Sequence, residues 1–443
     1  MTESAPPVAR RLAVGGLAAL TLINLLNYLD RYVVSALVPA LERAHMGLSD
    51  FRAGALMTGF LIVYMLTAPL FGILGDRASR TRAMAVGVLI WSLATGLSGL
   101  ARNYVQLLLG RAVVGIGEAA YGTIAPALLA DYFPVRSRGR VFAVFYMAIP
   151  VGSAFGYIVG GLAEHWFGWR AAFFIAGVPG IVLAWWFLRL PDPPRGVQEA
   201  LETAAAAVPA ASTTATPAAT TAPTATTLGA SPERAGLATF WRLLGNRPYL
   251  ITVLGYAAYT FAVGGLAFWM PTFLERVRAV PGAEATTGFG AIVVVTGFAG
   301  TFAGGWLGDY WLKFSREAYF WISALTALLA VPLAAVALAA PAPALYYPAI
   351  VGAELLLFMS TGPVNSAIVN LVSPHERASA VALSVLLIHL LGDVVSPPLI
   401  GALSDRTSLG TAVLIVPAAV AACGALWIAA GRAARRSRVL AAA

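Results

Sequence analysis

Hydrophobic residues gather into long runs along this chain, and short polar segments separate the runs. Each run reaches about 20 residues, the length that an α-helix needs to cross the hydrocarbon core of a bilayer. The runs lie at residues 12–40, 51–75, 82–101, 104–132, 139–163 and 170–190, and then at 247–276, 287–311, 317–340, 343–372, 377–402 and 409–432. The pattern predicts an all-α polytopic membrane protein with twelve transmembrane helices.

The composition supports this prediction, because 59% of the residues are hydrophobic and 11% are charged, against about 25% charged in soluble domains. The formal net charge of +9 is unevenly placed. If the N-terminus lies inside, 20 Lys and Arg residues fall in cytoplasmic segments and seven on the other side, with Arg31 and Arg111 completing the 29. The positive-inside bias then predicts a multi-pass protein of the inner (cytoplasmic) membrane with both termini cytoplasmic. The positive charge therefore does not indicate nucleic-acid binding.

The sequence offers little for metal or covalent chemistry. The single Cys423 excludes an intramolecular disulfide, and no Cys and His residues have metal-ligand spacing. The first run is too long, and with Asn27, Asp30 and Arg31 too polar, for a cleaved signal peptide. A membrane enzyme would need a nucleophile with its base or a metal set, so we expect no enzymatic activity and no cofactor.

A segment rich in Ala, Thr and Pro divides the chain. Residues 197–238 hold few large apolar side chains, so they bury too little surface to fold alone. The predicted organisation is a six-helix N-terminal half over 1–190, a largely disordered cytoplasmic linker over 191–246, and a six-helix C-terminal half over 247–443.

Short strings recur between the two halves. Gly-Ile-Leu-Gly-Asp at 72–76 returns as Gly-Trp-Leu-Gly-Asp at 305–309, and Gly-Gly-Leu-Ala-Glu at 160–164 returns as Gly-Ala-Leu-Ser-Asp at 401–405. The repeats indicate an internal duplication. Parallel six-helix halves are a known transporter design, with substrate and coupling sites near the midplane between them.

Four charged residues interrupt the apolar runs at membrane depth: Asp30 and Arg31 in the first run, and Arg111 and Glu118 in the fourth. Such groups are costly in a bilayer unless paired or wetted, so they mark a functional site by default. Residues 111 and 118 share one helical face, so Asp30 can pair with Arg111 and Arg31 with Glu118 if the first and fourth helices face each other. We predict that the four residues couple proton binding to conformation. The alternative is a purely structural ion-pair cluster.

Further residues are candidates for a substrate cavity. In the C-terminal half, Glu354 falls near the middle of the tenth run, and His389 and Asp393 lie one turn apart in the eleventh. The N-terminal candidates are Asn27, Tyr28, Tyr121 and Tyr146. For each of them, helix packing or interfacial anchoring is the alternative.

The segment that ends the second run resembles the loop signature of the major facilitator superfamily. The matching residues are Gly72, Asp76, Arg77, Arg80 and Arg82, with Ser79 where glycine is usual and Thr81 at a commonly basic position. The resemblance covers the whole chain and implies the major facilitator fold. It also implies a latch of Gly72, Asp76 and Arg77, in which the Asp76 carboxylate holds the positive end of the eleventh helix in the outward-open state. For Arg80 and Arg82, ordinary positive-inside charge is the alternative.

Within that superfamily, longer strings are similar to the Spinster family of lipid transporters. They lie at 27–31, 114–126, 145–152 and 389–397. The resemblance implies a secondary transporter, expected as a monomer, that moves lysolipid- or sphingolipid-like amphiphiles, with protons and membrane lipids as its other partners. A proton-driven exporter of drugs or small organic anions is the alternative. An ion channel would explain the charges but not the loop signature.

Overall fold

The computed structural model describes residues 7–134, 138–198, 237–372 and 376–442. Within these ranges, 12 helices are long and apolar enough to cross a membrane, which confirms the predicted all-α, twelve-span architecture. The N-terminal half contains α1 (Pro7–Arg43), α2 (Asp50–Arg77), α3 (Arg80–Ser98), α4 (Tyr104–Tyr132), α5 (Arg138–Phe167) and α6 (Trp169–Phe187). The C-terminal half contains α8 (Leu237–Gly245), α9 (Arg247–Arg276), α10 (Gly282–Trp311), α11 (Ala318–Ala339), α12 (Pro343–Asn370), α13 (Arg377–Ile388), η3 (His389–Asp393), α14 (Ser396–Arg406), α15 (Leu409–Ala412) and α16 (Ile415–Ala442).

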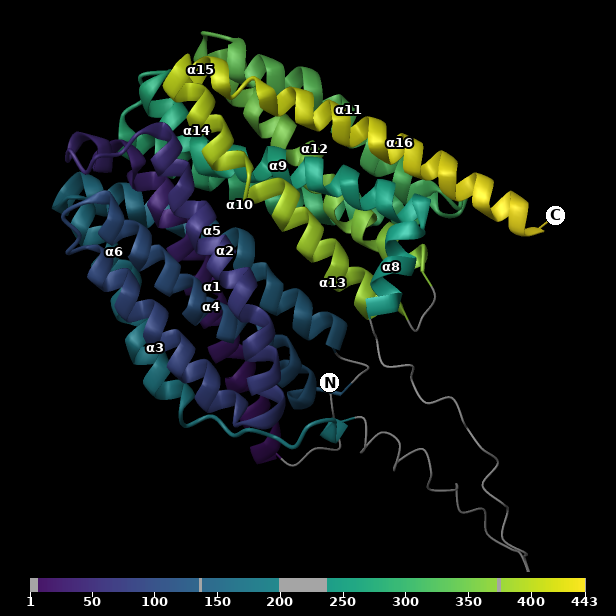
Figure 1. Cartoon of the computed structure of the whole chain (residues 1–443), viewed down its shortest axis with the longest axis horizontal. Coiled ribbons are helices and arrows are strands. Elements are labelled where there is room, and N and C mark those ends of the chain that lie inside the picture. Colours follow the sequence, from purple (N-terminus) through teal and green to yellow (C-terminus); the bar gives the residue numbers. More distant parts are fainter. Residues whose placement is uncertain (1–6, 135–137, 199–236, 373–375, 443) are drawn as a thin grey trace, which may run out of the picture.

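The two halves form separate helical bundles that meet at one end (Figure 1). The purple and blue helices α1 to α6 make up one bundle, and the green and yellow helices from α9 onward make up the other. The most extensive contacts between the bundles join α5 to α10 and α2 to α14. The ribbons diverge toward the end where α8 lies.

Polar side chains cap the helices at the short turns. Ser49 accepts a hydrogen bond from the backbone N–H of Arg52 at the start of α2, and Asn103 accepts one from Gln106 at the start of α4. Ser79 does the same for Arg82 at the start of α3. Such caps stabilise a helix by about 0.5–2 kcal/mol. The serine that departs from the superfamily's loop signature is therefore the N-cap of α3.

The eleventh apolar run is not the single helix that its hydropathy predicted. A π-helical turn, η3, follows α13, and α14 begins only at Ser396. Pro397 and Pro398 lack the N–H groups that would continue the α-helical hydrogen bonds there. The carbonyl of Val394 instead accepts a hydrogen bond from the Thr58 hydroxyl of α2 at 2.5 Å. Hydropathy does not detect such a break, because residues Ser379–Arg406 together are apolar enough to count as one span.

The predicted linker has ordered ends, whereas residues 199–236 lie outside the described part of the chain. Before them, Arg195 donates from Nη2 to the carbonyls of Gly75 and Ala78 at 2.6 and 2.8 Å. These two hydrogen bonds hold the segment after α6 against the turn between α2 and α3. After them, α8 is held by an Arg242–Glu376 ion pair of 2.7 Å. The assignment of the linker and the two halves as domains stays a prediction.

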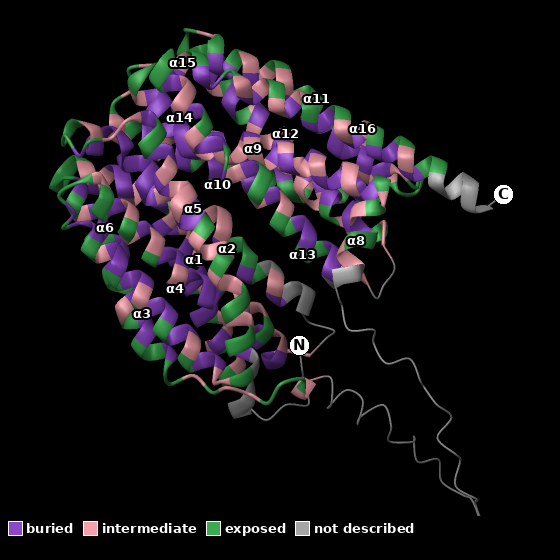
Figure 2. Ribbon diagram, viewed as in Figure 1, coloured by how far each residue is buried: buried purple, intermediate pink, exposed green. Residues whose placement is uncertain are grey.

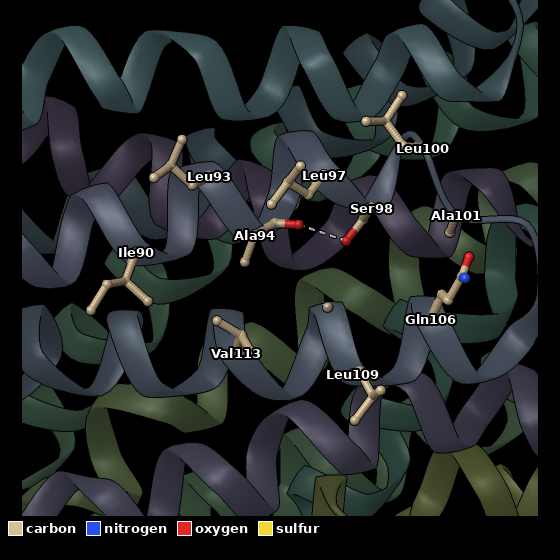
Figure 3. A pocket seen from close by; sticks show the side chains of 11 residues that line it. Ile90, Leu93, Ala94, Leu97, Ser98, Leu100, Ala101, Gln106, Leu109 and Val113 are labelled. Carbon is tan, nitrogen blue, oxygen red and sulfur yellow. Dashed lines mark hydrogen bonds between the residues drawn. The ribbon is translucent and has the colours of Figure 1, made fainter.

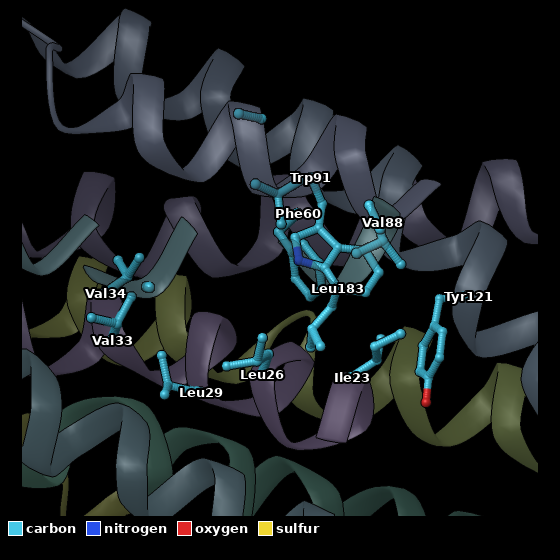
Figure 4. Packing of buried hydrophobic residues seen from close by; sticks show 14 of the residues in the cluster. Ile23, Leu26, Leu29, Val33, Val34, Phe60, Val88, Trp91, Tyr121 and Leu183 are labelled. Atoms are coloured by element: carbon cyan, nitrogen blue, oxygen red, sulfur yellow. The ribbon is translucent and has the colours of Figure 1, made fainter. Parts of the chain in front are cut away.

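Each half is built around its own apolar core. Figure 2 shows buried residues concentrated inside each bundle and exposed ones on the outer surfaces. In the N-terminal half, Ile23 and Leu26 of α1 belong to one cluster with Trp91 of α3 and Tyr121 of α4 (Figure 4). Large apolar side chains also remain on the outside, such as Leu66 and Phe302 at 70% and 78% exposure. In a multi-pass membrane protein, this apolar exterior faces lipid.

Candidate functional site

The four mid-membrane charges meet between α1 and α4 in two pairs. Arg31 Nε donates to Glu118 Oε2 at 2.8 Å. Arg111 Nη1 lies 3.6 Å from Asp30 Oδ2 and also donates to the backbone carbonyl of Asp30 at 3.3 Å. These are the pairings that the helical spacing predicted. Their role in proton coupling stays a prediction.

The cluster is shielded from solvent to different degrees. The side chain of Glu118 is fully buried, and those of Asp30 and Arg111 are 2% and 3% exposed. Arg31 is the most accessible member, with 14% of its side chain exposed. A buried charge is costly unless its partner stays in place, so movement of either arginine changes the energy of the acid beside it.

Aromatic rings surround both arginines. The guanidinium carbon of Arg31 lies 4.8, 5.1 and 5.2 Å from the ring centroids of Tyr28, Phe60 and Tyr64. Arg111 lies 4.9 Å from the Phe60 ring. Cation–π contacts of this kind contribute about 0.5–2 kcal/mol each, more where water is excluded. Tyr28, expected in the cavity, is thus part of the charge cluster.

Two residues that the sequence did not indicate complete the cluster. The Thr95 hydroxyl of α3 donates to Asp30 Oδ2 at 2.8 Å. Phe60 reaches both arginines because α2 packs directly on α4, where a Cβ at Gly115 would come within 2.6 Å of the Phe60 carbonyl. Neither residue type signals a site in an apolar helix, so only the packing shows their involvement.

The cluster keeps unused hydrogen-bonding capacity. Within the described residues, Asp30 Oδ1, Glu118 Oε1 and two guanidinium nitrogens of Arg111 are buried without a hydrogen-bond partner. The same holds for the amide nitrogen of Asn27, one turn before Arg31. Most buried polar atoms in folded proteins are satisfied. The concentration of unsatisfied ones here marks a place where a proton or a polar ligand group gains hydrogen bonds.

The C-terminal candidates lie at two separate places. Glu354 of α12 is half-buried and accepts a hydrogen bond from the Thr296 hydroxyl of α10 at 3.2 Å. His389 and Asp393 pair across η3, with His389 Nδ1 2.9 Å from both Asp393 carboxylate oxygens. Their side chains are 30% and 20% exposed. The structure therefore does not join these acids into the cluster of the other half.

Two of the predicted cavity tyrosines differ in their surroundings. Tyr121 is 1% exposed, and its hydroxyl donates to the Leu20 carbonyl at 2.5 Å. It packs in the N-terminal core rather than lining a cavity, because its one polar atom is satisfied there. Tyr146 is 47% exposed and stacks on Phe142 with ring centroids 5.9 Å apart. It alone of the two is available to a ligand.

A network of charges closes the end where the two halves meet. Arg276 of α9 donates to both carboxylate oxygens of Asp50 at 2.8 and 2.9 Å and pairs with Glu42 at 2.5 Å. Arg43 bridges Glu275 and Glu164 at 2.5 and 3.1 Å. These contacts join α1 and α2 of one half to α9 of the other. Hydropathy does not predict these ion pairs, because in the sequence each residue looks like an ordinary charged residue at the end of a helix.

The Asp405 carboxylate is the most direct part of this seal. It accepts hydrogen bonds from the backbone N–H groups of Asp50 and Phe51 at 2.8 and 3.0 Å, and so caps α2 from the opposite half. The helices touch closely here, because a Cβ at Gly401 would lie 2.2 Å from the Asp50 carbonyl. Asp405 ends the repeated string at 401–405, which was the only sequence signal for this contact.

The predicted latch lies at the other end of α2. Gly72 and Arg77 belong to the last turns of α2, and Arg77 is exposed. The side chain of Asp76 lies outside what the structure describes, so the latch stays a prediction. Arg80 is more than a topological charge: it is 3% exposed, bonds Asp192 through Nε at 2.9 Å and pairs with Asp131.

Comparison with known proteins adds the family. The sequence model described as Major Facilitator Superfamily matches residues 20–397. Protein spinster homolog 3 of Danio rerio is 34% identical over 426 residues, which cover 92% of this chain and 80% of that protein. Protein spinster homolog 1 of Homo sapiens is 35% identical over 409 residues, covering 88% and 72%.

A solved structure agrees in fold. The crystal structure of a bacterial homologue of the human lysosomal transporter Spinster, in an inward-facing conformation, superposes with a TM-score of 0.81 over 98% of this chain and 99% of that chain, at 24% identity. The fold and the relatives are those of transporters, which are not enzymes. With a superfamily match over most of its length and Spinster relatives above 30% identity, this chain belongs to the Spinster family of the major facilitator superfamily.

Proposed function

We propose that this transporter works by proton-coupled alternating access and moves lysolipid- or sphingolipid-like amphiphiles. The observation that carries the proposal is the neutral set of two acids and two arginines buried between α1 and α4. Protonation of Asp30 or Glu118 removes the partner of one arginine. That arginine then gains from an anionic headgroup or from a new position in the other conformation, so that proton binding and conformation become coupled.

The surroundings of the arginines favour a headgroup carrying one negative charge. Arg31 is the more accessible arginine and is flanked by the rings of Tyr28 and Tyr64. An amphiphile can place its anionic or zwitterionic head at this charge while its tail follows the apolar helices. Glu354 and the His389–Asp393 pair in the other half offer complementary groups for a positive or hydrogen-bonding part of the head.

A second candidate rests on the same aromatic surroundings. Three rings around one guanidinium also suit drugs or small organic anions with flat apolar parts. We therefore keep a proton-driven exporter of such compounds as the alternative. In either case we infer a monomer. We place it in the inner membrane with both termini cytoplasmic, because this orientation puts 20 Lys and Arg residues inside and seven outside.

A transport assay in proteoliposomes tests the proposal. The protein is offered lysolipids, amphipathic drugs and sugar acids, each with and without a pH gradient. Lysolipid movement that rises with the gradient in the wild type, and loses that rise in Asp30→Asn, is the expected result. Glu284→Gln, an exposed acid in the first turn of α10, is the matched control and should keep the rise. Gradient-independent transport by the wild type would contradict proton coupling, and transport of drugs or sugar acids alone would contradict lipid cargo.

A further inference from the structure

A groove between α3 and α4 lies outside the transport site described above. Its volume is about 590 Å³. From α3 and the turn after it, the lining residues are Ile90, Leu93, Ala94, Leu97, Ser98, Leu100 and Ala101; from α4 they are Gln106, Leu109, Gly110 and Val113. Figure 3 shows the two sets lying along neighbouring, antiparallel helices. The one hydroxyl in the wall, that of Ser98, is satisfied by the Ala94 carbonyl at 2.8 Å. Apart from Gln106, the groove is therefore apolar.

The groove faces the bilayer rather than the space between the halves. In Figure 1, α3 forms the outer edge of the N-terminal bundle, and α3 packs on α4 and α6 of its own half. Leu97 of α3 and Leu109 of α4, which both line the groove, are 63% and 61% exposed. Because α3 and α4 are both candidate membrane spans, what covers these side chains in the membrane is hydrocarbon.

The length and depth of the groove match one leaflet. Ile90 lies near the middle of the 19-residue helix α3, and Leu100 lies just beyond its end. Ten residues of helix rise about 15 Å, which is half of the roughly 30 Å hydrocarbon thickness. The groove thus runs from about mid-membrane to the level of the headgroups, the depth that a single acyl chain occupies.

Two arginines stand at the headgroup end of the groove. The backbone N–H of Arg102 donates to the side-chain oxygen of Gln106 at 2.7 Å, which fixes Arg102 next to the lining. Arg170 Nη2 donates to the carbonyl of Ala101 at 3.3 Å. Both arginines are exposed, and among the residues that the structure describes neither forms an ion pair with a carboxylate. The mouth is positively charged where a phospholipid carries its phosphate.

We propose that this groove is a lipid-binding site that holds one acyl chain of an anionic phospholipid, with its phosphate bound by Arg102 and Arg170. The site does not depend on the transported substrate, because it lies on the outer face of α3 and α4. It uses the charge attraction that basic residues exert on anionic lipids near a membrane surface. The walls supply the apolar contact, and the two arginines supply the preference for a negative head.

Native mass spectrometry of the protein released from nanodiscs tests the site. The nanodiscs contain equal amounts of phosphatidylglycerol and phosphatidylcholine, and the lipids that stay bound are counted. The wild type should retain phosphatidylglycerol in preference. Arg102→Gln should lower that preference about fivefold, the effect of one basic residue at the surface. Arg406→Gln, an exposed arginine at the same end of the other half, is the matched control and should leave the preference unchanged.

A second pair of variants tests the apolar walls of the groove without changing the charge of the protein. Val113→Trp fills the groove near mid-membrane and should abolish retention of the lipid. Val105→Trp adds the same side chain to the exposed face of α4 outside the groove and should leave lipid retention unchanged. Equal retention of both lipids by the wild type, or equal retention by Arg102→Gln and Arg406→Gln, would overturn the proposal. Transport activity is not the readout, so a failure here leaves the proposed function untouched.

Discussion

Replacing Arg111 by methionine tests whether the buried charge cluster couples proton binding to conformation or only stabilises the fold. Methionine keeps most of the apolar volume of the arginine and removes its charge. The change leaves Asp30 at membrane depth, 1% exposed. Among the residues that the structure describes, only the Thr95 hydroxyl, at 2.8 Å, then donates a hydrogen bond to its carboxylate. The buried acid then has to keep an uncompensated charge or bind a proton.

The size of the effect follows from the distance between the pair. For the 3.6 Å between Arg111 Nη1 and Asp30 Oδ2, Coulomb's law gives about 4.6 kcal/mol at an effective dielectric constant of about 20. Removing one member of a buried ion pair costs about 3–5 kcal/mol. We expect Arg111→Met to lower the free energy of unfolding by that amount.

Asp30→Asn should lower the free energy of unfolding by less than Arg111→Met does, because the groups around residue 30 keep their hydrogen bonds. The asparagine oxygen can still accept from Thr95. Arg111 keeps its hydrogen bond to the backbone carbonyl of residue 30 at 3.3 Å and its place 4.9 Å from the Phe60 ring. We expect a loss of about 1–2 kcal/mol. The double variant should recover part of the loss of Arg111→Met, with a coupling energy of about 3 kcal/mol.

The assay combines equilibrium unfolding in mixed micelles with transport in proteoliposomes on the same purified variants. Asp30→Asn should lose transport driven by a pH gradient and keep substrate exchange without a gradient. The reasoning is refuted if Asp30→Asn destabilises the protein as much as Arg111→Met while the pH dependence of transport stays as in the wild type. That pattern would identify the cluster as structural.

Further predictions concern the two ends of α2, the membrane topology and the transported substrate. Asp405→Asn should reduce crosslinking of cysteine pairs across the sealed end, because the α2 N-terminus loses a charge interaction worth about 0.3–1 kcal/mol; an unchanged yield would argue against this cap. Asp76→Asn should shift the protein away from the outward-open state by a similar amount, and the same crosslinks report it. Protease should cut residues 197–238 only from the cytoplasmic side of oriented vesicles, so cleavage from the other side would reverse the topology. Lysolipids should raise the melting temperature, and a shift caused by sugar acids alone would exclude lipid cargo.

The sequence was sufficient for those parts of the molecule that depend on local rules. Bilayer thickness fixes the length of a spanning helix, so the twelve spans could be read from hydropathy. Helical periodicity puts Arg111 and Glu118 on one face, which restricted the possible pairs with Asp30 and Arg31. These inferences need only one helix, or one pair of helices, at a time.

The remaining parts of the site depend on packing between segments far apart in the chain. Thr95 binds Asp30 from 65 residues away, and Asp405 caps α2 from 355 residues away. Threonine is common in membrane helices, and an aspartate at a helix end is ordinary, so neither stands out in the sequence. Tyr121 shows the opposite case. As an aromatic residue within a membrane span it was a candidate for the cavity, but its hydroxyl donates to the backbone carbonyl of Leu20, which holds it in the core.

The α2 and α13–α14 segments suggest how the two ends of the transporter are balanced. They come from different halves and run in opposite directions, so the C-terminal end of each lies at the same end of the protein as the N-terminal end of the other. In this structure α2 and α14 are in contact at the sealed end, and the bundles diverge toward the other end. At the sealed end, Asp405 near the end of α14 holds the first N–H groups of α2 at 2.8 and 3.0 Å. At the other end, Asp76 near the end of α2 is predicted to hold the start of α13 in the same way. Both interactions pair a carboxylate with a helix N-terminus and are of similar size, about 0.3–1 kcal/mol at an exposed site. Rocking of the halves would then exchange one cap for the other at little net cost. That leaves the protonation state of the buried cluster and the bound substrate to decide which conformation is favoured.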